Sequence, residues 1–241
     1  MIVDLEDASN SITPKSLLIL SGISGTLFAI SGMDFIGFFL YLFNRTSASE
    51  IYIRSWGNVL IGFIGTLLSL LVIPLIYVKI TRKKPLTDFG TTLGYKKWGF
   101  ISVALFLLSI PVLYFGSQDQ NLINTYPLTK DILVSWPIWL GYELLYISIY
   151  YIPYEFFFRG VLQLGLSKHW KKWQSILYVT ALTTLLHLTK PLTEILAAAA
   201  AGVIFGILAE KTNSWYYAFL MHITVGISTD IFCGLRFLAL I

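Results

Sequence analysis

The chain has 241 residues, of which 56% are hydrophobic and only 12% are charged, and its formal net charge is +4. A soluble domain is about 25% charged, and a mean hydropathy of +0.73 is too high for a water-exposed surface. This composition excludes a soluble enzyme and a disordered chain, and the single cysteine, Cys233, excludes an internal disulfide.

Seven apolar segments follow one another along the chain, and each approaches the length that a helix needs to cross a ~30 Å hydrocarbon core. The first is expected to tilt or break near Asp34, the fourth to kink at Pro137 and Pro153, and the seventh to break near Gly226. We therefore predict an all-α, polytopic transmembrane helical bundle with about seven spans. The segments cover residues 17–43, 57–80, 98–116, 132–166, 174–189, 192–210 and 214–238.

The organisation is that of one membrane domain without a soluble part. We divide it into a cytoplasmic tail at 1–16, transmembrane helices and loops at 17–131, and a core at 132–238. Gly202 and Gly206 form a small-xxx-small pattern, which predicts close packing of the sixth helix against a neighbour. A transporter would predict inverted repeats with paired broken helices, and no second half is evident.

Lysine and arginine are distributed unequally between the two sides of this topology. With the N-terminus in the cytoplasm, more than twice as many basic residues lie inside as outside, which is the positive-inside pattern. The richest loops, 81–97 and 167–173, then share the cytoplasmic side. The inside set is Lys15, Lys79, Arg82, Lys83, Lys84, Lys96, Lys97, Lys168, Lys171, Lys172 and Lys211, and the outside set is Arg45, Arg54, Lys130, Lys190 and Arg236.

Several ionisable residues fall inside these apolar segments, where they are costly and usually face the protein interior. At ~1.5 Å per residue, Glu155 lies ~20 Å along its helix from the nearest cytoplasmic lysine, His187 lies ~22 Å and His222 lies ~16 Å. Three helices thus place a carboxylate and two imidazoles at similar depth. Asp34, Glu143 and Asp230 are more simply explained as polar contacts between helices.

A carboxylate and two histidines in a buried cavity can hydrolyse an amide without a nucleophilic side chain. The carboxylate takes a proton from water that one histidine orients, and the other histidine donates to the oxyanion. The same groups could instead hold a zinc ion, but there is no His-Glu-x-x-His spacing. No Gly-x-Ser-x-Gly elbow points to a serine triad. We expect no cofactor.

The motifs around these residues resemble the CAAX protease and bacteriocin-processing (CPBP or Abi) family of intramembrane proteases. That family has Glu-Glu-x-x-x-Arg on one helix, Phe-x-x-x-His on the next and His-x-x-x-Asn on a later one. This chain has Tyr154-Glu155 followed by Arg159, then Thr183 followed by His187, and His222 followed by Gly226. The resemblance covers about residues 132–230.

The resemblance implies an intramembrane endopeptidase in which the first Glu and the second-motif histidine activate water. It also implies that the third motif supports the oxyanion and that Arg159 is closer to structural. Three positions depart from the pattern: Tyr154 replaces the first Glu, Gly226 replaces the Asn, and Thr183 replaces the aromatic residue. A one-residue step on a helix rotates a side chain by ~100°, so Glu155 does not simply replace its neighbour.

We therefore expect a diverged intramembrane endopeptidase with a weakened or rearranged site. The expected catalytic residues are Glu155, His187 and His222, with Arg159, Tyr154 and Asp230 in support. The alternative is a catalytically silent membrane scaffold or regulator with the same fold. Expected partners are membrane lipid and a peptide or protein substrate, which is lipidated in eukaryotic relatives. No basic stripe predicts nucleic acid binding. The expected location is a prokaryotic plasma membrane, with the N-terminus in the cytoplasm.

Overall fold

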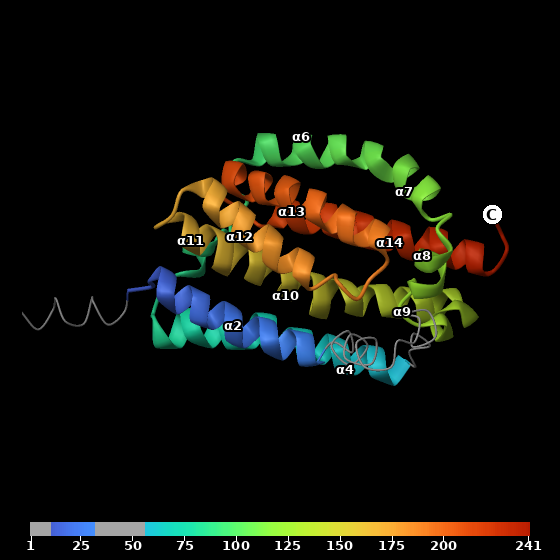
Figure 1. Ribbon diagram of the computed structural model, residues 1–241, viewed down its shortest axis with the longest axis horizontal. Helices are drawn as coiled ribbons and strands as arrows, with labels where there is room; N and C mark the ends of the chain where they lie inside the picture. The colour runs from blue at the N-terminus through green and yellow to red at the C-terminus, as the bar shows by residue number, and fades with distance from the viewer. Residues whose placement is uncertain (1–10, 32–55) are drawn as a thin grey trace, which may run out of the picture.

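The structure is a computed structural model that describes residues 11–31 and 56–241, and all regular structure in these two ranges is helical. The helices run roughly along one long axis, so the molecule is an elongated bundle (Figure 1). The predicted all-α class is confirmed. The predicted break near Asp34 lies outside the described residues, as do Arg45 and Arg54.

The first half of the described chain contains three long helical segments. Helix α2 is Pro14–Ser31. The second segment runs without a break through α4 (Trp56–Leu67), η2 (Leu68–Val72), α5 (Ile73–Leu75) and η3 (Ile76–Thr81). The turn η4 (Leu86–Phe89) precedes α6 (Lys96–Phe106), η5 (Leu107–Ser109) and α7 (Ile110–Gly116), and α8 (Gln120–Thr125) and η6 (Lys130–Val134) follow.

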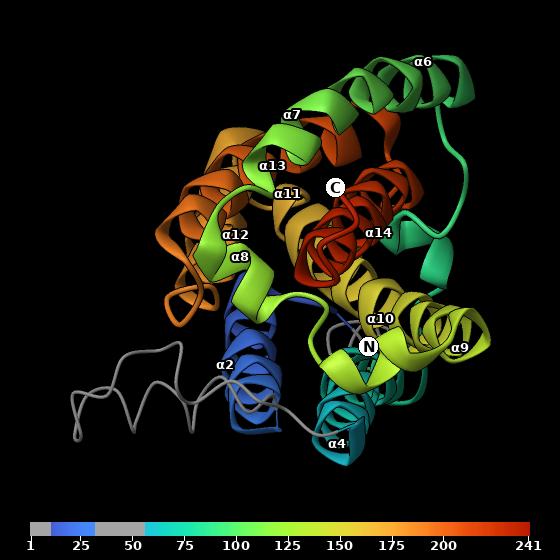
Figure 2. The same cartoon turned by 90° about the vertical axis from the view of Figure 1, so that its right-hand side faces the viewer.

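The second half begins with a continuous helix from Trp136 to Ser167. It consists of α9 (Trp136–Tyr146), η7 (Ile147–Tyr151), α10 (Ile152–Glu155), η8 (Phe156–Leu164) and α11 (Gly165–Ser167), and η7 and η8 are π-helical. Helices α12 (Lys172–Leu185), α13 (Leu192–Thr212) and α14 (Tyr216–Phe237) complete the chain. Seen from one end of the bundle, α14 lies near the middle, with α10 on one side and α6 and α7 on the other (Figure 2).

Two of the expected helix irregularities are absent. Pro137 lies in the first turn of α9, where a backbone N–H has no intrahelical partner in any case, so it starts the helix and does not kink it. Helix α14 continues through Gly226 without a break. Pro153 does lie inside the long helix, and the π-helical stretches η7 and η8 flank it on both sides.

Five helical segments of the described chain are long and apolar enough to cross a membrane, so the protein is an integral, multi-pass membrane protein. The large apolar side chains that they expose, such as Leu108 and Val112, are expected on a surface that faces lipid. These five segments are Pro14–Ser31, Trp56–Thr81, Lys96–Gly116, Leu192–Thr212 and Tyr216–Phe237. The other two predicted spans correspond to the helix from Trp136 to Ser167 and to α12.

The two lysine-rich loops lie at the same end of the bundle. Lys168 forms an ion pair with Asp88, with 3.4 Å between Nζ and Oδ2. The Tyr95 N–H, beside Lys96, donates to the carbonyl of Thr212, beside Lys211, at 3.0 Å. The first turn of α2 is at this end as well (Figure 1). The basic residues that the sequence assigned to one side are therefore gathered in space.

The predicted close approach of the small-residue helix is confirmed. A Cβ atom added to Gly202 would meet the side chain of Thr180, and one added to Gly206 would meet Ile176, both on α12. Helices α12 and α13 thus form a tightly packed hairpin, which fixes the position of the turn between them. That turn carries His187.

Candidate active site

The centre of the candidate site is a direct contact between Glu155 and His222. The Glu155 carboxylate ends α10 and is fully buried, and its Oε1 atom lies 2.6 Å from Nδ1 of His222 on α14. The His222 side chain is 20% exposed. Among the described residues, Nε2 of His222 has no hydrogen-bond partner. The contact places a proton on Nδ1 and leaves Nε2 turned away from the carboxylate.

Arg159 lies on the other side of the carboxylate, one helical turn further along. Its Nε atom is 3.5 Å from Glu155 Oε2, which is an ion pair rather than a hydrogen bond. Both side chains are at least 98% buried, so each neutralises a charge that would be costly alone. The expected pairing of these two residues is therefore present as an ion pair.

Gln163 extends this polar row toward the lysine-rich end of the bundle. It is fully buried, it accepts a hydrogen bond from Arg159 at 3.3 Å, and it donates to the backbone carbonyl of Gly206 at 2.8 Å. Its amide also contacts Glu210, which in turn accepts from Ser167. Gln163 was not among the predicted site residues, although its spacing of four residues after Arg159 places both on one face of the helix.

Three aromatic rings surround His222. The ring centroids of Tyr151, Tyr154 and Phe205 lie 4.8, 5.3 and 5.9 Å from the imidazole centroid. Tyr154 is buried and also packs against Phe158 at 4.6 Å. Tyr154, which stands in place of the family's first glutamate, thus lines the site with its ring. Phe205 carried no sequence signal, whereas Tyr151 could have been found from its position four residues before Glu155.

Tyr151 also accounts for the glycine at position 226. A Cβ atom added to Gly226 would collide with the Tyr151 hydroxyl oxygen. The hydroxyl therefore occupies the space into which the family's asparagine would project from α14. A polar hydrogen-bonding group is still present at this position, but it comes from a different helix.

His187 lies just beyond the C-terminal end of α12 and is half-buried. Its Nδ1 atom is 2.8 Å from the backbone carbonyl of Thr183, which can only accept, so Nδ1 carries a proton and Nε2 is directed elsewhere. Within the described residues, no hydrogen bond joins His187 to Glu155 or to His222. Thr183 is buried and donates to the carbonyls of Val179 and Thr180.

Asp230 belongs to a second buried cluster. It lies eight residues after His222 on α14, ~12 Å along the helix axis, and its Oδ2 accepts a hydrogen bond from Tyr142 at 3.1 Å. The Glu143 carboxyl group interacts with it, and both acidic residues are at least 98% buried. The structure therefore groups Asp230 with α9 residues and not with Glu155 and His222.

The described residues contain no group of three or more His, Cys, Asp or Glu side chains placed to hold a metal ion. Cys233, the only cysteine, is buried on α14 as a free thiol. The site geometry thus consists of one carboxylate, two separate imidazoles, one arginine and the surrounding aromatic rings.

Comparison with known proteins identifies one family. Residues 136–228 match the family model described as type II CAAX prenyl endopeptidase Rce1-like. No curated protein and no solved structure matches the chain. The matched region begins at the first turn of α9 and ends within α14, so it contains Glu155, Arg159, His187 and His222. The resemblance seen in the sequence motifs is confirmed over residues 136–228, which match the model of the Rce1-like CAAX prenyl endopeptidase family.

Proposed function

We propose that the protein is an intramembrane endopeptidase that hydrolyses peptide bonds with water activated by the Glu155–His222 pair. The observation that carries this proposal is the 2.6 Å contact between a fully buried carboxylate and a partly exposed imidazole. A carboxylate in this position holds the imidazole in one tautomer and stabilises the imidazolium that forms when Nε2 accepts a proton. The family match over residues 136–228 supports the reaction class.

The chemistry can be written with this chain's own residues. Nε2 of His222 takes a proton from water while the water oxygen bonds to the carbonyl carbon of the substrate. The imidazolium then gives that proton to the amide nitrogen as the carbon–nitrogen bond breaks. His187, whose Nδ1 proton is directed to Thr183, presents an unprotonated Nε2 that accepts the second hydrogen of the water and orients it.

The oxyanion of the tetrahedral intermediate needs a donor, and Tyr151 is the group available for this role. Its hydroxyl stands beside Gly226, at the place where the family carries an asparagine amide. A phenolic O–H is a suitable donor to a developing oxyanion. In this proposal, Arg159 and Gln163 are positioning residues, because Arg159 pairs with Glu155 and Gln163 holds Arg159. Tyr154 is neither a base nor a donor but packs against the imidazole.

The proposed substrate is a peptide whose scissile bond enters the membrane, and the first probe is a prenylated peptide. Purified protein in liposomes is incubated with a farnesylated peptide that ends in a CAAX sequence and with the same peptide without the lipid. We expect cleavage that falls about 10²- to 10⁴-fold in His222→Ala and in Glu155→Gln, since each removes part of the base. His169→Ala, a change of an exposed histidine outside the site, should keep the wild-type rate.

Cleavage that survives unchanged in both His222→Ala and Glu155→Gln would show that the base has been misassigned. Tyr151→Phe removes only the hydroxyl and tests its role at the oxyanion. We expect kcat to fall about 10²- to 10³-fold with little change in KM. An unchanged kcat would remove Tyr151 from the oxyanion site.

The second candidate function is that of a catalytically silent scaffold. The observation in its favour is the ring of Tyr151, Tyr154 and Phe205 around His222, which fills space that a substrate would need. In that case wild type cleaves neither probe. A partner protein that is crosslinked in membranes by wild type, and lost in Glu155→Gln, would then identify the site as a binding surface.

We extend the proposal to the orientation of the chain. The lysine-rich loops 81–97 and 167–173 face the cytoplasm of a prokaryotic cell, with seven spans that include the helix from Trp136 to Ser167 and α12. The proposal rests on the gathering of basic residues at one end of the bundle.

A further inference from the structure

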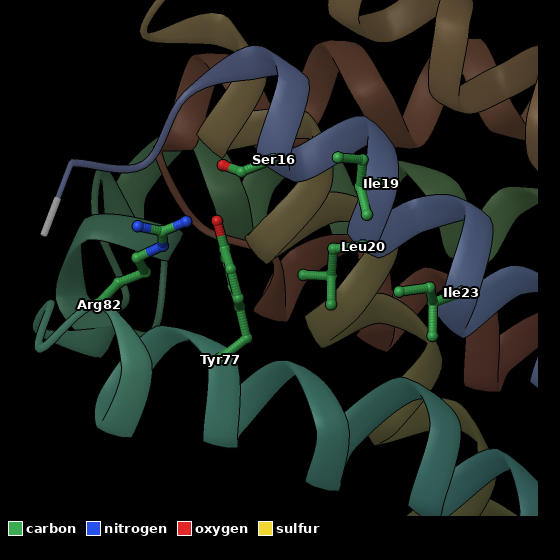
Figure 3. A pocket seen from close by; sticks show the side chains of 6 residues that line it. All are labelled: Ser16, Ile19, Leu20, Ile23, Tyr77 and Arg82. Atoms are coloured by element: carbon green, nitrogen blue, oxygen red, sulfur yellow. The ribbon is translucent and has the colours of Figure 1, made fainter. Parts of the chain in front are cut away.

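A cavity of about 180 Å³ lies outside the candidate active site, between α2 and the end of the second helical segment. Its walls are apolar on the α2 side, where Ile19, Leu20 and Ile23 line it, and polar at one end, where Ser16, Tyr77 and Arg82 line it (Figure 3). Ile19 and Ile23 are about half exposed, so the apolar wall continues onto the surface that faces lipid. The cavity is thus an amphipathic groove that opens toward the bilayer.

The polar end of the cavity has the geometry of an anion site. The Arg82 guanidinium is 5.3 Å from the centroid of the Tyr77 ring, and both side chains extend toward Ser16 on α2 (Figure 3). The Tyr77 hydroxyl is buried and has no hydrogen-bond partner among the described residues. A buried donor without a partner is costly, and an anionic oxygen in the cavity would satisfy it.

The position of the groove indicates which kind of anion it takes. Ser16 is in the first turn of α2 and Arg82 directly follows η3, so the polar end is at the lysine-rich end of the bundle. Lys15 stands next to Ser16 in the chain and is exposed. Basic clusters at the border of a transmembrane helix attract the anionic head groups of lipids. The isoleucines extend from this border into the span, along the direction of an acyl chain.

The volume of the cavity agrees with a head group and excludes a whole lipid. That space accommodates a phosphate and the glycerol carbons next to it, while the acyl chains lie outside along Ile19 and Ile23. We propose that this groove is a binding site for an anionic phospholipid, with Arg82 and the Tyr77 hydroxyl on the phosphate and the α2 isoleucines along an acyl chain.

Native mass spectrometry of the full chain after delipidation tests the proposal. Phosphatidylglycerol and phosphatidylcholine with equal acyl chains are titrated separately, and we expect the anionic lipid to bind about tenfold more tightly. Arg82→Gln should weaken phosphatidylglycerol binding at least fivefold, and Tyr77→Phe about three- to fivefold. Lys83→Gln removes the same charge from the adjacent exposed residue and is the matched control, with a change of less than about twofold. Tyr77→Phe keeps the test informative if Arg82→Gln folds poorly.

Three results would overturn the proposal. Equal binding of the two lipids removes the head-group preference, and equal losses in Arg82→Gln and Lys83→Gln leave only a diffuse surface charge. Inorganic phosphate that raises the thermal midpoint as much as phosphatidylglycerol shows a bare anion site without a role for the acyl chain. Replacing Asp4, Glu6 and Asp7 with their amides should leave lipid binding unchanged. A tenfold gain would instead identify the chain's own acidic N-terminus as the occupant.

Discussion

The Tyr151 hydroxyl stands where a side chain at position 226 would project from α14, so these two positions share one volume. The family pattern at 226 cannot be restored by a single substitution for this reason. Any attempt to rebuild the asparagine must first remove the phenol ring from the neighbouring helix. The glycine at 226 and the tyrosine at 151 are thus two parts of one structural change, in which the phenol takes the space of the family's asparagine.

We predict that Gly226→Asn alone destabilises the protein by about 1–3 kcal/mol, because it overpacks the η7–α14 contact at Tyr151. Tyr151→Ala alone should also destabilise, since it leaves a cavity beside His222. The double variant should recover part of both losses, and the thermal midpoint in detergent measures the coupling. Strictly additive losses would show that the two side chains do not compete for space.

The same pair controls any rescue of the family motif. Tyr154→Glu with Gly226→Asn should raise cleavage of the farnesylated probe only when Tyr151→Ala is also present. A rise in the double variant without that third change would contradict the predicted collision. If the activity comes from the rebuilt site, adding His187→Ala to the triple variant should remove it.

Gln163 should stabilise the bundle through its three hydrogen bonds inside the protein. Gln163→Leu has nearly the same size, but it takes the acceptor from Arg159 Nη1 and removes the donor to the Gly206 carbonyl and the Glu210 carboxylate. We expect a loss of about 1–3 kcal/mol for the groups left unsatisfied, measured as a lower thermal midpoint. Gln118→Leu, the same change at an exposed position, is the control. Equal midpoints for the two variants would contradict the prediction.

The buried carboxyl groups of Glu143 and Asp230 should respond unequally to substitution. Two acidic groups side by side in a low-dielectric interior repel each other unless a proton is shared between them. Glu143→Gln removes this repulsion and keeps the shape, so we expect an equal or higher midpoint. Asp230→Ala removes the acceptor of the Tyr142 hydroxyl. It should lower the free energy of unfolding by about 1–3 kcal/mol, measured as a lower thermal midpoint. A loss in Glu143→Gln as large as that in Asp230→Ala would show that both carboxyl groups are required.

The orientation can be tested without a cysteine-free background, because the only cysteine is buried. Single cysteines at Thr87 and Lys171 occupy exposed positions in the two lysine-rich loops, and one at Asn121 is exposed at the opposite end of the bundle. In intact cells, a membrane-impermeant maleimide should label Asn121→Cys only. Labelling of Thr87→Cys or Lys171→Cys before lysis would reverse the proposed topology.

The apolar segments were readable from the sequence because the bilayer imposes one length and one composition on every span. Six of the seven segments are helices within a few residues of the predicted bounds, and the described part of the first is helical too. Helix ends were harder to place. The segment predicted to begin at residue 132 begins its continuous helix at Trp136, after a 3-10 turn, because Pro137 sets the first turn there.

The direct contact between Glu155 and His222 could not be predicted from the sequence. Matched depth placed both groups at one level, but a rotation of ~100° per residue holds only in a regular α-helix. Glu155 stands between two π-helical stretches, η7 and η8, in which the hydrogen bonds run from i to i+5. The angular position of each residue therefore shifts along this helix, and a wheel drawn from the sequence misplaces its faces.

Helix α12 leads to His187 and is only 14 residues long, which is ~21 Å at 1.5 Å per residue. The segment Trp56–Thr81 has 26 residues and reaches up to ~39 Å. A bilayer that matches the longer segment is too thick for α12, so we expect the membrane to become thinner on that side. Such hydrophobic mismatch costs fractions of a kcal/mol per ångström and sorts proteins among membranes of different thickness. The polar turn at His187 would then meet the carbonyl layer of the lipids instead of their tails.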